Sequence, residues 1–123
     1  MKLLTKGILE QTSELLDDDG KDNHKRNVTA KFFDPTGSFT WYLTEIGEDK
    51  DLCFGLVTSQ YEPNGELGYF TISELESIQG PFGLGIERDV NFQTTTLDII
   101  MDKVGYPYYC LLYTSDAADE GLG

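Results

Sequence analysis

The stretch GYFTISELESIQGPFGLGIERDVNF, from Gly68 to Phe92, decides the fold of this chain. Aromatic and β-branched residues at its start favour a strand over 67–72. At its other end apolar and charged residues alternate, which predicts a half-buried strand over 86–92. A helical turn and a glycine-rich loop are expected between them, so this one segment supplies two strands and their connection.

The helical turn carries its own start and stop signals. Ser73 and Glu76 have the spacing of a capping box, in which each side chain accepts a hydrogen bond from the backbone amide of the other residue. Gly80 is expected to end the turn in the left-handed conformation, because glycine has no Cβ to clash there. Pro81 then prevents the helix from continuing.

Earlier in the chain, the pattern predicts three more strands, over 28–33, 39–46 and 52–59. A turn at Asp34–Gly37 has proline and glycine in favoured places, and Asn64-Gly65 suits a type I′ hairpin. Because connections this short join neighbouring strands, we expect the strands to be antiparallel.

Two helices flank these strands. The first is expected to begin at Thr5, a candidate cap, and to run to about Leu16, where acidic residues that oppose the helix dipole follow. The second begins at Thr95 or Thr96 and stops at Gly105. The sequence therefore predicts an α+β fold: an antiparallel sheet of about five strands with an N-terminal helix, a short capped helical turn and a C-terminal helix, the helices covering one face.

Several short motifs are spaced along the chain: Lys31-Phe32-Phe33, Thr40-Trp41-Tyr42, Phe54-Gly55, Gly68-Tyr69-Phe70, Glu74-Leu75-Glu76, Gly80-Pro81 with Gly83-Leu84, and Ile86-Glu87-Arg88-Asp89. With these motifs the chain resembles a bacterial domain-of-unknown-function family, number twenty-nine fifty-eight, over residues 1–98. The resemblance implies a protein found largely on plasmids, phages and other mobile elements. It implies no established activity and no catalytic residues.

Length and charge narrow the choice of function. The chain has 123 residues and a net charge of −13, and residues 36–109 hold twelve acids against three bases, a net of −9. One domain is expected, over residues 1–109. The acidity disfavours direct binding of nucleic acid and favours a basic protein partner. No apolar run has the length of a membrane span or a signal-peptide core, so we expect a cytoplasmic protein without membrane contact.

The C-terminal residues have a separate origin in our interpretation. Residues 110–120 read CLLYTSDAADE, which resembles the translation of a transposon-type sequencing adapter. We therefore expect 110–123 to be a non-native tail that replaces the native C-terminus. Cys53 is then the one native cysteine, so no disulfide is expected within the domain.

Seven residues are candidates for a binding site: Trp41, Glu45, Glu74, Glu76, Glu87, Arg88 and Asp89. An exposed aromatic residue among acids would suit a protein interface, although ordinary sheet packing explains Trp41 more simply. For Arg88, we favour a structural ion pair with a neighbouring carboxylate over the alternative, which is ligand binding. The sequence has no nucleotide-binding loop, zinc-ligand spacing or nucleophile elbow, and its single histidine, His24, lies in a predicted polar connector. No catalytic residue, metal or cofactor is therefore assigned.

Three functions remain open. The first is a non-catalytic binding protein that acts on a host or element protein, with acids such as Glu87 and Asp89, about 6.5 Å apart on a strand, mimicking nucleic-acid phosphates. The second is a metal-dependent hydrolase in which the five candidate carboxylates converge. The third is a structural or regulatory accessory protein whose acidity serves only solubility.

Overall fold

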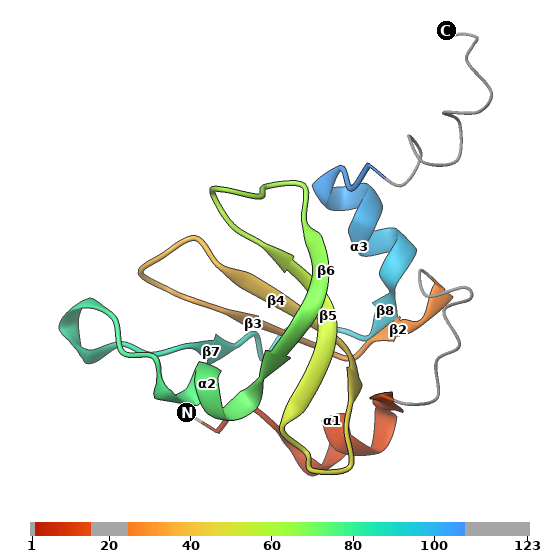
Figure 1. Ribbon diagram of the computed structural model, residues 1–123, viewed down its shortest axis with the longest axis horizontal. Coiled ribbons are helices and arrows are strands. Elements are labelled where there is room, and N and C mark those ends of the chain that lie inside the picture. Colours follow the sequence, from red (N-terminus) through yellow and green to blue (C-terminus); the bar gives the residue numbers. More distant parts are fainter. Residues whose placement is uncertain (1, 16–24, 108–123) are drawn as a thin grey trace, which may run out of the picture.

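The structure is a computed structural model that describes residues 2–15 and 25–107 (Figure 1). His24 and residues 108–123 lie outside the described residues. The non-native tail therefore stays a prediction.

A six-stranded sheet forms the centre of the protein, and its main strands run in the order β6-β5-β4-β3-β7. All of these neighbours are antiparallel, whereas β1 adds to β4 in parallel. A separate antiparallel pair is formed by β2 and β8. The strands are β1 (Ser13–Glu14), β2 (Asn27–Val28), β3 (Ala30–Phe33), β4 (Thr40–Ile46), β5 (Leu52–Thr58), β6 (Glu66–Thr71), β7 (Glu87–Arg88) and β8 (Thr95–Thr96).

The predicted α+β class is confirmed, with two changes to the predicted strands. The strand expected over 28–33 is divided at Thr29 between two sheets, because β2 leaves the main sheet to pair with β8. The strand expected over 86–92 is reduced to β7, which pairs with the end of β3.

The helices are α1 (Lys6–Gln11), α2 (Ile72–Ser77) and α3 (Leu97–Val104), with a 3-10 turn, η3, at Pro81–Gly83. Contrary to the prediction, α1 ends well before Leu16. Thr12 takes an extended conformation and its hydroxyl donates to the Ile8 carbonyl, after which Ser13 and Glu14 form β1. None of the helices in the described part of the chain has the length and apolar character needed to cross a bilayer.

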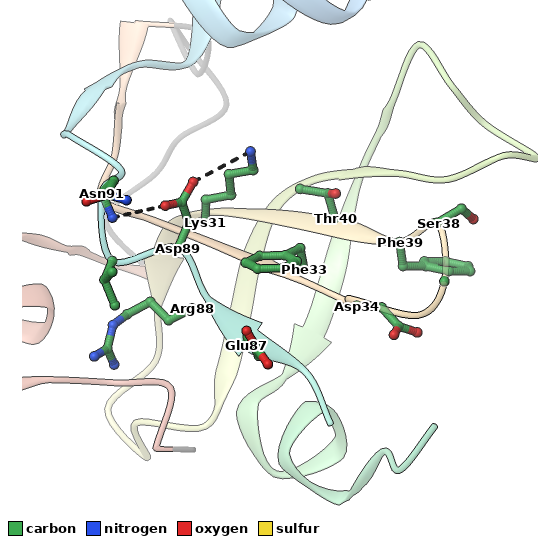
Figure 2. A pocket seen from close by; sticks show the side chains of 12 residues that line it. Lys31, Phe33, Asp34, Ser38, Phe39, Thr40, Glu87, Arg88, Asp89 and Asn91 are labelled. Carbon is green, nitrogen blue, oxygen red and sulfur yellow. Dashed lines mark hydrogen bonds and ion pairs between the residues drawn. The ribbon is translucent and has the colours of Figure 1, made fainter. Parts of the chain in front are cut away.

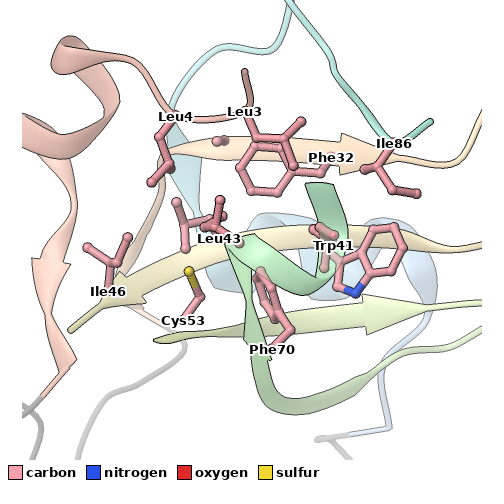
Figure 3. Packing of buried hydrophobic residues seen from close by; sticks show 12 residues of the cluster. Leu3, Leu4, Phe32, Trp41, Leu43, Ile46, Cys53, Phe70 and Ile86 are labelled. Atoms are coloured by element: carbon pink, nitrogen blue, oxygen red, sulfur yellow. The ribbon is translucent and has the colours of Figure 1, made fainter. Parts of the chain in front are cut away.

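Helices cover both faces of the sheet, not one face as predicted (Figure 1). On the first face, α2 and the N-terminal segment pack over the strands (Figure 3). On the second face, α3 packs over β5 and β2. The first core includes Leu3, Phe32, Trp41, Leu43, Ile46, Cys53, Phe70, Ile72 and Leu75, and the second consists of Val28, Leu56, Leu97, Ile100 and Met101.

The capping box of α2 lies two residues earlier than predicted. The Thr71 hydroxyl accepts from the Glu74 amide at 3.1 Å, and the Glu74 carboxylate accepts from the Thr71 amide at 3.0 Å. Ser73 is not the cap because its amide and hydroxyl both donate to the Asp51 carboxylate, at 2.7 and 2.9 Å. Glu76 instead accepts from the Leu3 amide at 3.1 Å, which ties α2 to the N-terminal segment.

The end of α2 also differs from the prediction. Gly80 is extended, with φ −93°, and its amide donates to the Leu84 carbonyl within a narrow loop. Positive φ falls instead on Phe82 and Gly83, at 64° and 73°. Glycine is favoured at position 80 for a different reason: a Cβ there would lie 2.6 Å from Thr36 Oγ1.

The β5–β6 connection is not the predicted type I′ hairpin. That turn needs two consecutive residues with positive φ. Here Gly65 has a φ of 92°, but the φ of Asn64 is not positive. The Asn64 side-chain amide donates to the Val104 carbonyl at 2.8 Å, so this loop is fastened to α3. At the end of α3, Gly105 is left-handed with φ 75°, as the sequence predicts.

Two glycines that face each other across β5 and β6 provide a matched test of the fold. Gly55 and Gly68 are register partners. A Cβ on Gly55 would lie 1.8 Å from the Tyr42 carbonyl oxygen, whereas a Cβ on Gly68 would meet nothing within 4 Å. We expect Gly55→Ala to lower the free energy of unfolding by at least about 2 kcal/mol, because the backbone of β4 must move. Gly68→Ala should leave it unchanged or raise it by about 0.5 kcal/mol.

Urea denaturation of both variants measures the difference. Equal stabilities for the two variants would contradict the close packing of β4 on β5.

Candidate functional site

The seven predicted site residues do not form one site. Trp41 lies in the first core with 8% of its surface exposed, and Glu45 is buried with 2% exposed. Glu74 and Glu76 lie on α2, where they cap the helix and hold the N-terminal segment. Residues 87–89 stay together at the β7 edge of the sheet.

Glu45 is a structural carboxylate. Arg26 Nε lies 2.8 Å from Glu45 Oε2, and both side chains are largely buried. A buried carboxylate requires such a partner, because an uncompensated charge in a protein interior is costly. The Glu45 carboxylate therefore stabilises the fold through its ion pair with Arg26.

A surface cavity of about 540 Å³, the β7 pocket, lies beside residues 87–89 (Figure 2). The strands β3, β4 and β7 line it, with Phe33 in its wall. Lys31 Nζ lies 3.7 Å from Asp89 Oδ2, and Asp89 Oδ1 accepts from the Asn91 amide at 2.9 Å. Lys31 also lies 6.0 Å from the centre of the Tyr42 ring. Burial and the nearby Asp89 raise the pKa of the Tyr42 phenol.

Arg88 turns away from its acidic neighbours in sequence, since adjacent strand residues point to opposite faces (Figure 2). Its Nη1 donates to the carbonyls of Lys2 and Leu3, at 2.8 and 3.1 Å. Leu3 is completely buried in the first core. Arg88 thus holds the N-terminal segment on the sheet, which favours the structural interpretation of this residue.

A second cavity, of about 450 Å³, lies on the first face between β6 and α2, and we call it the β6 hollow. It exists because Gly68 has no side chain to fill it. Its wall is apolar, and Glu66 and Glu74 are exposed acids among its lining residues. None of the residues that line it is a cation. The apolar side chains that line it are Trp41, Val57, Phe70, Leu75 and Ile78, whereas Leu67 and Tyr69 border it from the strand and point their side chains to the other face.

The β6 hollow brings together two of the predicted site residues, Trp41 and Glu74, and adds two that the sequence interpretation missed, Glu66 and Gly68. A signal for the missed pair exists. A glycine inside a strand of aromatic and β-branched residues often marks a place where another chain or ligand approaches the backbone.

The candidate carboxylates do not converge as the hydrolase hypothesis requires. Within residues 2–15 and 25–107, no group of three or more histidine, cysteine, aspartate or glutamate side chains is arranged to hold a metal ion. Glu45, Glu74, Glu76 and Asp89 each have a separate local partner. The described residues therefore give the hydrolase hypothesis no support.

Cys53 is a core residue and not a nucleophile. Burial raises the pKa of its thiol to about 12, with further contributions from Asp51 and Asp49. The thiolate is the reactive form, so the side chain is inert at neutral pH.

The Cys110→Ser variant leaves Cys53 as the one cysteine of the chain. In the folded state of this variant, we expect Cys53 to resist modification by a thiol-reactive disulfide reagent at pH 8. It should react at once when urea unfolds the chain. Because the folded protein disfavours the thiolate, stability should fall as the pH rises above the ordinary thiol pKa and towards 12. Rapid labelling without denaturant would contradict the buried position.

The Arg88 contacts predict a stability effect. Arg88→Met keeps the apolar stem and removes the donors, so we expect unfolding to become about 1–2 kcal/mol easier. Lys103→Met, which removes an exposed cation from α3, is the control and should change stability by less than about 0.5 kcal/mol. Hydrogen exchange should show faster opening at Leu3 in the Arg88 variant. An unchanged hydrogen-exchange rate at the Leu3 amide would mean that Arg88 does not hold the N-terminal segment on the sheet.

Comparison with known proteins agrees with the resemblance found in the sequence. The model of a family described as Protein of unknown function (DUF2958) matches residues 3–101. No curated protein and no solved structure matches the chain. The matched region contains both cavities and all seven predicted site residues. The chain therefore belongs to the DUF2958 family of proteins of unknown function.

Proposed function

We propose that this protein is a non-catalytic binding protein that recognises a basic protein. The observation that carries the proposal is the β6 hollow, which combines an apolar wall with Glu66 and Glu74 and has no cation in its lining. Such a surface suits a lysine or arginine side chain, whose apolar stem packs on the wall while its charge reaches the acids.

The distribution of cations supports the same function. Three cations are held within the fold: Arg26 by the buried Glu45, Lys31 by Asp89, and Arg88 by backbone carbonyls. With these pairs counted, residues 2–15 and 25–107 still hold fifteen acids against eight bases, a net charge of −7 that acts on the surroundings. Association with a basic protein is accelerated by such a field.

Phosphate mimicry by residues 87 and 89 receives less support than binding at the β6 hollow. Asp89 is paired with Lys31, so part of the charge that would imitate a second phosphate is neutralised. We therefore place the main contact at the β6 hollow. In keeping with the mobile-element setting that the family resemblance implies, the proposed partner is a basic protein of the host or of the element.

The test compares two double variants of equal charge. Glu66→Gln with Glu74→Gln removes both acids of the β6 hollow, and glutamine at position 74 can keep the capping box. Glu10→Gln with Glu48→Gln removes two exposed acids elsewhere. Proteins captured from a bacterial lysate on the immobilised full chain should be basic. The affinity of the best-retained one, after purification, should fall about tenfold for the first variant and less than about twofold for the second.

Salt provides the second measurement. Association should slow as salt rises from 0.1 M to 1 M, because the Debye length falls from about 10 Å to about 3 Å. If both double variants lose affinity equally, the acidic residues act only through the overall negative charge of the protein and not through a contact at the β6 hollow. If no basic protein is retained, the accessory role with solubilising acidity is the better explanation.

A further inference from the structure

We infer that the partner binds by adding an extended segment to the open edge of β6, as a further strand of the sheet. This inference rests on the proposed function and names the binding mode and the chemistry of the segment. Its first support is topological. Among the described strands, β6 ends the sheet, with β5 on one side and no strand on the other (Figure 1).

The register identifies which backbone groups point to that edge. The Ile72 amide donates to the Asp51 carbonyl at 2.9 Å, and these residues continue the register of β6 with β5. Hydrogen-bonded and non-hydrogen-bonded pairs alternate in an antiparallel ladder. Residues 66, 68 and 70 therefore bond to β5, while Leu67 and Tyr69 direct their amides and carbonyls outward. The next outward amide, of Thr71, is already bonded to Glu74, so the capping box closes this end of the edge.

Apart from the charge of Glu66, the edge lacks the sequence features that usually prevent strand addition. Natural edge strands are protected by lysine, proline or a bulge. The sequence of β6, ELGYFT, has no lysine or proline, and its register with β5 is continuous. Tyr69 has 66% of its surface exposed, and the space beside Gly68 is open. The groups needed to pair with another strand are thus accessible.

The β6 hollow defines which segment fits. On the first face, an added strand would place one side chain beside Gly68, facing the apolar wall of the hollow, and another beside Glu66, two residues away. Opposite charges and apolar pairs are the favoured neighbours across strands. The segment therefore carries an apolar residue flanked at alternate positions by lysine or arginine. Binding of this kind combines backbone hydrogen bonds with pockets for alternate side chains.

A second copy of this chain is a poorer occupant. Its own β6 has no cation to place beside Glu66, and two chains of net charge −13 repel each other. We therefore assign the edge to a basic partner segment.

The experiment uses the full chain and a synthetic peptide, Thr-Lys-Thr-Val-Thr-Lys-Thr, with blocked ends. Its matched control carries N-methyl groups on alternate amides, which remove the edge donors and leave the charge unchanged. We expect the unmodified peptide to bind at least tenfold more tightly than the control. In nuclear magnetic resonance hydrogen exchange, the Leu67 and Tyr69 amides should become protected when the peptide is added.

Two variants of Tyr69 separate backbone pairing from side-chain contact. Tyr69→Pro removes an amide that faces the edge and not β5, so the sheet should be retained. Tyr69→Thr keeps the amide and removes the ring. The proline variant should lose at least tenfold in peptide affinity relative to the threonine variant. The exchange measurement on the unaltered chain decides the question if the proline variant does not fold.

The outcomes separate this inference from the proposed function. If Glu66→Gln with Glu74→Gln weakens a basic partner while the Leu67 and Tyr69 amides stay unprotected, the function holds and strand addition is wrong. If these amides become protected to the same extent by a peptide with glutamate in place of lysine, strand addition holds and basic recognition is wrong. Protection that grows with protein concentration alone would assign the edge to a second copy. If the peptide does not bind, the inference is overturned, and the basic-protein test judges the function separately.

Discussion

The buried ion pair between Arg26 and Glu45 is the interaction on which the arrangement of the sheets depends. Glu45 lies in β4, opposite Phe54 of β5 and beside Ser13 of β1. The Arg26 carbonyl accepts from the Leu97 amide, at the first residue of α3. The pair therefore joins the main sheet, the β2–β8 pair and the C-terminal helix. Removing one partner of a buried pair typically costs about 3–5 kcal/mol, because the other charge stays in the interior.

A bulge in β4 makes this pair possible. Trp41 and Leu43 face the first core, and strict alternation would point Glu45 there as well. The register shifts between Leu43 and Glu45, so the carboxylate turns to the second face and Ile46 takes its place in the first core. One extra residue in the strand thus keeps a charge out of an apolar core and aims it at Arg26.

Local patterns predicted most element types, and long-range partners account for the main errors. The strands β4, β5 and β6 and the Gly105 stop follow from residue type and spacing, which act within a few residues. The cap of α2 was misplaced because Asp51 bonds Ser73, a contact between residues 22 positions apart. Glu45 was named as a candidate binding residue, and its structural role was missed because its cation, Arg26, lies in a segment that alternation cannot place beside it. The β6 hollow was not predicted, although Trp41 and Glu74 were among the seven candidate residues, because an absent side chain at Gly68 gives only a weak signal.

Acidity and the open edge of β6 have a common physical explanation. An unprotected strand edge pairs readily with copies of itself, and the usual remedies of lysine, proline or a bulge are missing here. A net charge of −13 opposes that association between copies by long-range repulsion, without blocking any backbone group of the edge. Under the proposed function, the same charge would attract a basic segment, with Glu66 and Glu74 as its neighbours in the β6 hollow. In the proposed binding mode, the acidity leaves the backbone groups of Leu67 and Tyr69 available and favours basic chains over acidic ones at this edge.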